Sequence, residues 1–485
     1  MPPRRCGCFY WNNGARNDRA PAQIGTSGNA PPSSSRQKGT ARREFSRFQR
    51  RLHLSLATVN VVPNSKNLPD EISASSRAKP NIRPGKLFQK DSPVGLVIAR
   101  MPPMREPSVL GDPGERRDNL SGWLMYLVIF VGLMARMLVA TYGHNYDMDS
   151  YRIVAGIMDH GGNVYAETPR YNYGPVWFQT IHAIDLVAGH QRVVFRYFMA
   201  GFLSLVDVGI FFVLWKKYGR AAAAFFFLNP ISVIITGYHS QFDNLAVLLG
   251  LFSVLLMQDD FDKPVGSRKF CGLLVLGLSL MTKHLLFVFP FWLAVKQKGL
   301  GQKAIVVMVP ILVFLAGFAP YWHDGSQGII ANVFQYKSAN NEYFYKMFVP
   351  QGLQFMFSGL AVWFFSLAVF AFLCRKKTAI ESLLLYTAVL VATSPAIANQ
   401  YLATPIPFVA THMNPFTILF TGAGVLHLLV DVNGFNRVGL TSSGCADIAV
   451  SFLFFGLIWV VWRAEITALF KRCVLEIEKQ WSGKE

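Results

Sequence analysis

The sequence predicts an all-α integral membrane protein of about twelve transmembrane helices, with a large first extracytoplasmic segment. Composition is the first reason, because 52% of the 485 residues are hydrophobic and 15% are charged, whereas a soluble domain carries about 25% charged residues. Apolar runs of about 17–22 residues are the second reason, since that length crosses a hydrocarbon core of roughly 30 Å. The third is the spacing of the basic clusters, which divides the connecting segments between two sides.

The first predicted span runs from Leu120 to Tyr142 and follows Arg116-Arg117. Basic residues stay on the cytoplasmic side, so the N-terminus is predicted inside and the segment after Tyr142 outside. Segment 175–190 is only mildly apolar and is expected to be a helix in the outer interface. The other predicted spans lie near 193–215, 221–238, 242–257, 270–282, 284–295, 304–321, 352–373, 379–394, 400–412, 415–430 and 447–463. With this count every later basic cluster falls inside.

The chain divides into three predicted parts: a disordered basic tail at 1–118, a multipass transmembrane domain at 119–463, and a basic cytoplasmic tail at 464–485. The first part is rich in Pro, Ser, Gly and Arg and has no apolar period that could build a core. It is either a cytoplasmic tail or an over-extended start, with initiation near Met101 or Met104, and we expect no cleavable secretory signal. Its 21 basic and 9 acidic residues account for most of the net charge of +19, so nucleic-acid binding is not expected. The six cysteines are scattered and predict neither a disulfide framework nor a zinc site.

The predicted topology brings five distant polar segments to the outer face. They are the segment that begins at Asp147, the turn 237–244, Lys283-His284, the loop 321–350 and the segment 394–401. The loop 321–350 carries Lys337, Glu342, Tyr343, Tyr345 and Lys346, which suit closure over a substrate. Convergence of polar segments at one face predicts a functional site there.

Asp147 and Asp149 stand at the start of the first outer segment. One carboxylate at the outer rim could act as a general base, and the pair could hold a divalent cation such as Mg²⁺ or Mn²⁺ against a phosphate. The competing interpretation is a solvated loop in which Asp149 caps a helix.

Two further motifs interrupt apolar stretches. His239, Gln241 and Asp243 could bind sugar hydroxyls or a phosphate, or could simply cap the next span. Lys283-His284 could face an anionic lipid phosphate, or Lys283 could snorkel to the interface. Arg136 and Asp207 lie inside the first and second spans and are expected to form a structural ion pair.

Together these residues resemble the C-type glycosyltransferase (GT-C) superfamily, which uses polyprenyl-phosphate sugars. The segment DMDSY…GGNVYAETPRYNYGP is similar to the first-loop pattern of the GPI mannosyltransferase I catalytic subunit. NPISVIITGYHSQFDN is closer to the dolichyl-phosphate-glucose glucosyltransferases, and TKHLLFVFP and NQYLATPIP resemble two further segments of these families. The resemblance covers roughly residues 120–430.

The resemblance implies that Asp147 is the catalytic aspartate and Asp149 its partner. It implies substrate-binding or loop-shaping roles for a larger set: Tyr165, Arg170, Tyr171, Tyr173, His239, Gln241, Asp243, Lys283, His284, Gln400 and Tyr401. The implied reaction is an inverting transfer of a hexose, mannose or glucose, from a polyprenyl or dolichyl phosphate to a glycan or lipid-linked acceptor on the non-cytoplasmic face.

The predicted partners are therefore the lipid-linked donor, the acceptor and membrane lipid. A bacterial inner membrane is the expected location, or the ER membrane in a eukaryote. A transporter or lipid flippase is the alternative, and it would need ionisable residues near the midplane and an internal repeat, which the sequence lacks. A catalytically inactive scaffold subunit is a third interpretation.

Overall fold

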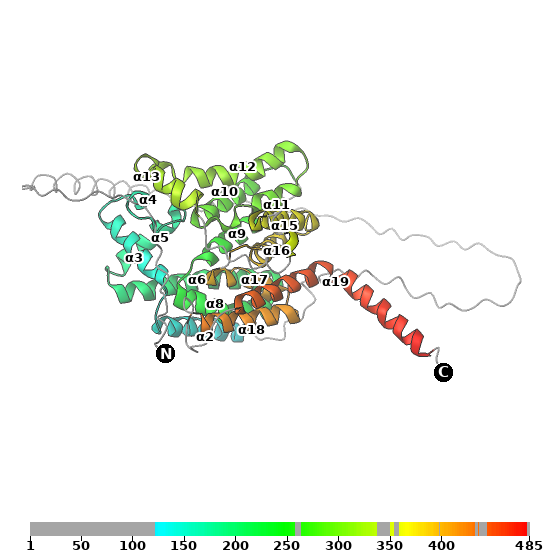
Figure 1. Cartoon of the computed structure of the whole chain (residues 1–485). Helices are drawn as coiled ribbons and strands as arrows, with labels where there is room; N and C mark the ends of the chain where they lie inside the picture. The colour runs from blue at the N-terminus through cyan, green and yellow to red at the C-terminus, as the bar shows by residue number, and fades with distance from the viewer. Residues whose placement is uncertain are drawn as a thin grey trace, which may run out of the picture. The chain divides into compact units, whose positions relative to one another are not determined.

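The computed structural model describes residues 122–257, 263–336, 350–353, 358–396, 398–431, 435 and 444–482, with side chains of the last helix up to residue 463. Within these ranges the regular structure is entirely helical, as the sequence predicts (Figure 1). The predicted tail at 1–118, the C-terminal side chains beyond 463 and the polar residues 337–346 lie outside this description.

Four helical stretches are long and apolar enough to cross a membrane in the part of the chain that is described. A fifth candidate consists of two helical pieces that meet at an angle of 46°. The first piece is α7 (Arg220–Leu228). The second is Pro230–His239, made of α8 (Pro230–Ile234) and the π-helical turn η1 (Ile235–His239). The four are α2 (Gly122–Thr141), α6 (Arg192–Tyr218), Leu300–Phe334 and the first part of α19, Cys445–Arg463. The stretch Leu300–Phe334 comprises α12 (Leu300–Ala316), η4 (Ala319–Tyr321), α13 (Trp322–Gly328) and η5 (Ile329–Phe334). The whole of α19 is Cys445–Ser482.

Shorter apolar helices occupy most of the other predicted spans. They are α9 (Asp243–Met257), α10 (Ser267–Thr282), η3 (His284–Leu286) with α11 (Phe289–Val295), α15 (Gly359–Leu373), α16 (Ala379–Ala392) and α18 (Pro415–Val430). α15 begins later than the predicted start at 352, after η6 (Gln351–Leu353). The predicted span at 400–412 is instead η7 (Asn399–Leu402) followed by α17 (Ile406–Thr411), whose 6 residues cannot cross a bilayer alone. The count of twelve spans remains a prediction.

The first outer segment contains three helices. The helix predicted at 175–190 is present, whereas two of the three lie within 145–174, where the sequence suggests a loop. The three helices are α3 (Tyr146–Asp159), α4 (Val164–Glu167) and α5 (Pro175–Val187). The Asn145 side chain caps α3 by accepting from the Asp147 backbone N–H, and Asn163 caps α4 in the same way. Pro175 occupies the first turn of α5, where its missing N–H costs nothing.

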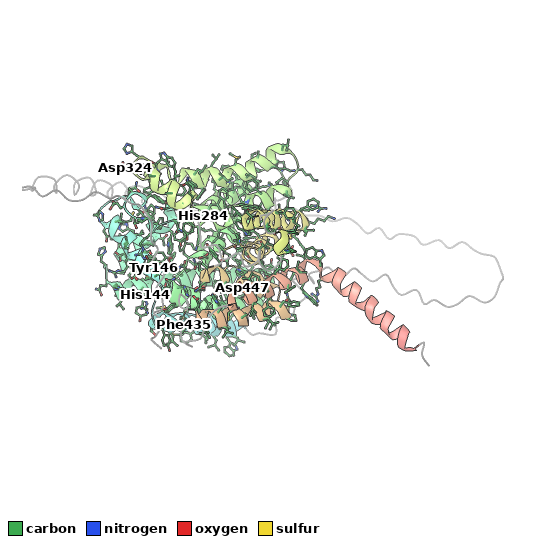
Figure 2. The ribbon with its side chains drawn as sticks, viewed as in Figure 1. His144, Tyr146, His284, Asp324, Phe435 and Asp447 are labelled. Atoms are coloured by element: carbon green, nitrogen blue, oxygen red, sulfur yellow. The ribbon has the colours of Figure 1, made fainter. Side chains whose placement is uncertain are left out.

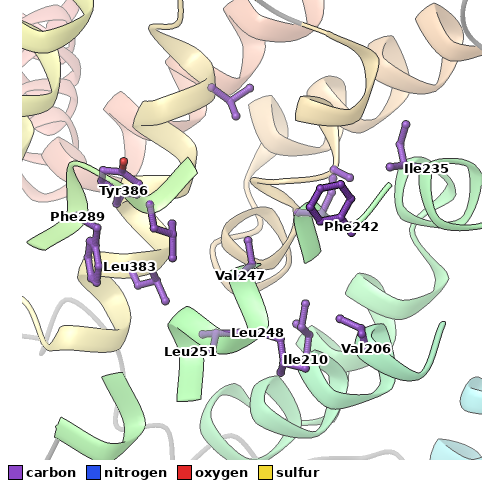
Figure 3. Packing of buried hydrophobic residues seen from close by; sticks show 14 of the residues in the cluster. Val206, Ile210, Ile235, Phe242, Val247, Leu248, Leu251, Phe289, Leu383 and Tyr386 are labelled. Atoms are coloured by element: carbon purple, nitrogen blue, oxygen red, sulfur yellow. The ribbon is translucent and has the colours of Figure 1, made fainter. Parts of the chain in front are cut away.

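The apolar core lies where α9 packs against α6, α10 and α16 (Figure 3). Ile210 from α6, Val247 and Leu251 from α9, and Leu383 from α16 are all fully buried there. By contrast, α2 exposes a row of large apolar side chains, including Trp123, Tyr126, Phe130 and Leu138. Exposing so many large apolar side chains to water is unfavourable, whereas contact with lipid hydrocarbon is not. This face of α2 therefore suits a membrane.

The buried ion pair expected between Arg136 and Asp207 is present. Nε of Arg136 lies 2.9 Å from Oδ2 of Asp207, and both side chains are fully buried. Arg136 also donates to Oγ of Ser232, while Thr236 and Asn244 donate to the Asp207 carboxylate. The pair therefore fixes the segment from 232 to 244 against α2 and α6, and that segment contains η1 and the turn after it.

Segments predicted to be cytoplasmic also meet one another. Nζ of Lys296, after α11, donates to the backbone carbonyls of Cys374 and Lys377, after α15. Nζ of Lys269 in α10 donates to Oε1 of Gln297. The basic segments at 263–269, 296–303 and 374–377 thus gather at one end of the helices.

Candidate functional site

Asp147 meets the turn after η1. Nε2 of Gln241 donates to Oδ2 of Asp147, and Nδ2 of Asn145 donates to the same oxygen over 3.1 Å. The Asn145 amide is also 3.1 Å from Nδ1 of His239. Both amides donate to Oδ2. Among the described residues, Oδ1 of Asp147 is therefore the oxygen that can accept a hydrogen bond from another group.

A second carboxylate and a cation lie beside this group. Nζ of Lys283 is 2.6 Å from Oδ2 of Asp243, and the two side chains are 6% and 1% exposed. The same ammonium faces the rings of Tyr173, Phe242 and Tyr401, at 5.1, 4.9 and 5.8 Å from their centroids. A buried cation held by one carboxylate and surrounded by aromatic rings retains N–H groups for an anionic ligand.

Several buried polar atoms around these residues have no hydrogen-bond partner in the described part of the chain. They are the Tyr151 hydroxyl, Nε2 of His239, Oγ of Ser240, Oε1 of Gln241 and Oδ1 of Asp243. Leaving a buried polar group unpaired costs about 1–3 kcal/mol, and such groups are uncommon in native proteins. Their concentration beside Asp147 and Lys283 indicates a place where a polar ligand or water completes the bonding.

Two tyrosines of the first outer segment keep their protons at this site. Burial, followed by the negative charge of Asp147, raises the pKa of Tyr173 well above its usual value. Burial also raises the pKa of Tyr151 well above its usual value, with smaller contributions from Tyr173 and Asp147. Both hydroxyls are therefore neutral hydrogen-bond donors at physiological pH.

Asp149 does not share a site with Asp147. Its Oδ1 lies 3.0 Å from Nη2 of Arg192, and these side chains are 42% and 62% exposed. The reason is the helix: residues two apart in α3 point in directions about 200° apart, whereas in the expected loop they could have converged. The arrangement does not support a cation held jointly by Asp147 and Asp149.

Tyr165 and Tyr171 are inside the first outer segment. The Tyr165 hydroxyl donates to the Tyr173 carbonyl over 2.9 Å, and the Tyr171 hydroxyl donates to the Gly174 carbonyl over 2.6 Å. Each side chain is 1% exposed. Their geometry fits the loop-shaping role implied by the resemblance, and it leaves Tyr173 as the tyrosine of this set next to Lys283.

The other predicted residues lie at the edge of the cluster. The Arg170 guanidinium stacks on the Tyr146 ring at 3.8 Å. His284 follows Lys283 in η3, and Gln400 precedes Tyr401 in η7. Neither His284 nor Gln400 makes a side-chain hydrogen bond to the cluster among the described residues. Figure 2 labels Tyr146 and His144 near α3, and His284 near α10.

Two close backbone approaches hold the first outer segment against the helices. A Cβ on Gly174 would lie 1.8 Å from the Met281 carbonyl oxygen, and one on Gly328 would lie 1.8 Å from the Tyr165 carbonyl oxygen. Only glycine fits either position. The first contact sets Tyr173 beside Lys283, and neither contact has a sequence pattern that predicts its partner.

An apolar cavity of about 1320 Å³ adjoins this contact. Its lining combines side chains from α2, α5, α6, α10 and α12 with residues just beyond α12, including Met137, Val176, Phe202, Met281, Ala316 and Tyr321. Two of its lining residues, Pro175 and Met281, are each two positions along the chain from a residue of the polar cluster, Tyr173 and Lys283 respectively. Its walls suit a hydrocarbon chain.

No protein-family model matches the sequence, and no curated protein matches it significantly. Two solved structures of ArnT from Cupriavidus metallidurans, one in the apo state and one bound to undecaprenyl phosphate, are similar over 70% of this chain and 76% of theirs, with 14% identity and a TM-score of 0.41. A similarity of this degree establishes neither a common fold nor a function.

Proposed function

We propose that this protein is a membrane glycosyltransferase that transfers a hexose from a polyprenyl phosphate to a hydroxyl of a glycan or lipid-linked acceptor. One observation carries the proposal: a partly exposed carboxylate, Asp147, and a buried cation, Lys283, lie in one cluster of unpaired polar atoms beside an apolar cavity. These are the groups that such a reaction requires, namely a base, a partner for the phosphate, hydrogen bonds for the sugar and an apolar site for the lipid chain.

Asp147 is the proposed general base. Gln241 and Asn145 hold Oδ2, so Oδ1 can accept the proton of the acceptor hydroxyl. The hydroxyl oxygen attacks the anomeric carbon while the bond from that carbon to the phosphate oxygen breaks. The electron pair leaves on the polyprenyl phosphate, and attack opposite to the leaving group inverts the anomeric centre.

Lys283 is the proposed partner of the departing phosphate. Asp243 takes one of its N–H groups and keeps the ammonium in place, while the rings of Tyr173 and Tyr401 exclude water from it. A charge-assisted hydrogen bond in a site of low dielectric constant is stronger than one in water. The unpaired atoms at 239–243 are proposed to bind the sugar hydroxyls, and the cavity to hold part of the polyprenyl chain.

Release of polyprenyl phosphate by the purified protein tests this function. The protein is incubated with polyprenyl-phosphate mannose or glucose and a membrane lipid extract as acceptor, with and without a chelator. We expect release of polyprenyl phosphate together with a lipid or glycan product that carries the transferred sugar. This activity should persist in the chelator, because no metal takes part in the proposed transfer step. A flippase would move the intact donor across a vesicle bilayer without releasing polyprenyl phosphate, and that result would replace the proposal with the alternative.

A further inference from the structure

A second cluster of ionisable side chains lies at the other end of α3 from Asp147. It joins Asp159, the last residue of α3, to Asp185 near the end of α5 and to His190 just beyond it. One ligand atom from each of these three residues lies within 4.8 Å of the other two. The cluster has no residue in common with the proposed catalytic site.

One imidazole nitrogen faces two carboxylate oxygens in this cluster. Nδ1 of His190 is 2.8 Å from Oδ2 of Asp185 and 3.2 Å from Oδ2 of Asp159. A single N–H can donate one good hydrogen bond, so the two oxygens together exceed what His190 offers. In a tetrahedral site with bonds of about 2.0–2.1 Å, ligand atoms lie about 3.3 Å apart. The two distances from His190 are 0.1 and 0.5 Å shorter than that, and the two carboxylate oxygens lie within 4.8 Å of each other.

In the described part of the chain, histidines are the only basic side chains that pair with the carboxylates of the cluster. Among the described residues, no Lys or Arg forms an ion pair with Asp159 or Asp185, and the Asp185 side chain is only 8% exposed. Two nearby carboxylates repel each other, and burial of one of them increases the cost. A divalent cation balances the two charges when the imidazole is neutral.

The surrounding residues hold these groups in position. Nε2 of His182 lies 3.2 Å from Oδ1 of Asp159, which leaves Oδ2 directed at the cluster. His190 adopts a positive φ of 59°, a conformation that a residue with a Cβ rarely takes, and it directs the ring back toward α5. A partner that orients a ligating carboxylate is typical of a metal site.

We infer that Asp159, Asp185 and His190 bind one divalent transition-metal cation, Zn²⁺ before Mn²⁺, and that His182 orients Asp159 from outside the ligand set. The nitrogen ligand favours Zn²⁺ over Ca²⁺ or Mg²⁺, which prefer oxygen alone. Three protein ligands leave a fourth position for water. The cation would tie the end of α3 to the end of α5, and this inference does not depend on the proposed transferase activity.

The test measures metal on the purified full-length protein, prepared with an affinity tag that contains no histidine. After chelator treatment, the wild type and the His190→Ala variant are dialysed against Zn²⁺ alone. We expect the wild type to retain one more Zn²⁺ per chain than the variant. In competition titrations, we expect His182→Ala to weaken binding about 10–100-fold and His190→Ala to weaken it at least as much.

His160→Ala is the matched control, because His160 adjoins Asp159 in sequence but pairs with Glu167. It should bind Zn²⁺ like the wild type. The His190 side chain is 54% exposed, so its removal should leave the fold intact, and thermal unfolding without metal checks this. Equal Zn²⁺ content in wild type and His190→Ala, equal loss in His160→Ala, or a preference for Ca²⁺ would each overturn the inference.

Discussion

The proposed mechanism depends most directly on the base, and Asp147→Asn removes the base with little change of shape. The structure predicts which way the new amide will turn. Gln241 and Asn145 both donate to Oδ2, so the asparagine carbonyl oxygen must occupy that position. Its NH₂ group then takes the place of Oδ1, where the acceptor proton would have to arrive. The variant presents a donor where the reaction needs an acceptor.

The expected loss follows from the worth of general base catalysis, which is about 10²–10⁴-fold in rate. That range corresponds to about 2.7–5.5 kcal/mol in the activation free energy. Folding should change by only about 1 kcal/mol, since the two hydrogen bonds become neutral but keep their geometry. Donor binding should hardly change, because Lys283 and not Asp147 is the proposed partner of the phosphate.

The assay is the initial rate of polyprenyl phosphate release at saturating donor, with donor affinity measured separately on the same preparations. Asp149→Asn is the matched control, since it removes an equal charge two residues away and breaks only an exposed pair with Arg192, worth about 0–1 kcal/mol. Near-normal turnover in Asp147→Asn, or an equal loss in Asp149→Asn, would refute the assignment of the base.

Three further predictions concern the architecture around the base. Lys283→Met should destabilise the protein by about 3–5 kcal/mol, because it leaves Asp243 buried without a partner. In chemical denaturation the double variant with Asp243→Leu should recover most of that stability, but it should not recover activity. A double variant as unstable as the single one would contradict the pairing argument. Gly174→Ala should lower the unfolding temperature and the activity, because the added Cβ meets the Met281 carbonyl. The control is Gly156→Ala in α3, which has open space around it and should be neutral or stabilising by up to about 1 kcal/mol. Equal effects of the two substitutions would count against the close approach. Single cysteines at positions 147 and 217 should be labelled by an impermeant reagent from opposite sides of the membrane, and labelling of both from one side would exclude the proposed topology.

Apolar runs and charged residues within them made much of the architecture predictable. The pair of Arg136 and Asp207 was predictable because two opposite charges in apolar helices have few other ways to be compensated. The meeting of Asp147, Gln241, Lys283 and Tyr401 followed from the alternation of the connecting segments, and the observed contacts agree with it.

Other features depend on information that sequence patterns do not carry. Whether Asp147 and Asp149 share a ligand depends on where α3 begins, and the Asn145 cap that decides this is a single side chain. The contact of Gly174 with Met281 joins backbones more than a hundred residues apart. Asp159 and His190 are likewise brought together by the packing of α3 alongside α5, which places the ends of the two helices together, and by a positive φ, so no spacing rule for metal ligands would have found them.

The pairing of Arg136 with Asp207 also constrains how the protein enters the membrane during synthesis. A lone arginine in an apolar helix disfavours insertion by up to about 2.5–3.5 kcal/mol, and the counter-charge of Arg136 lies 71 residues further along the chain. At a synthesis rate of about 5–20 residues per second, this delay is about 4–14 s. During that interval the unpaired arginine is expected to slow the transfer of α2 into lipid. The arrival of α6 would then release both helices into lipid together.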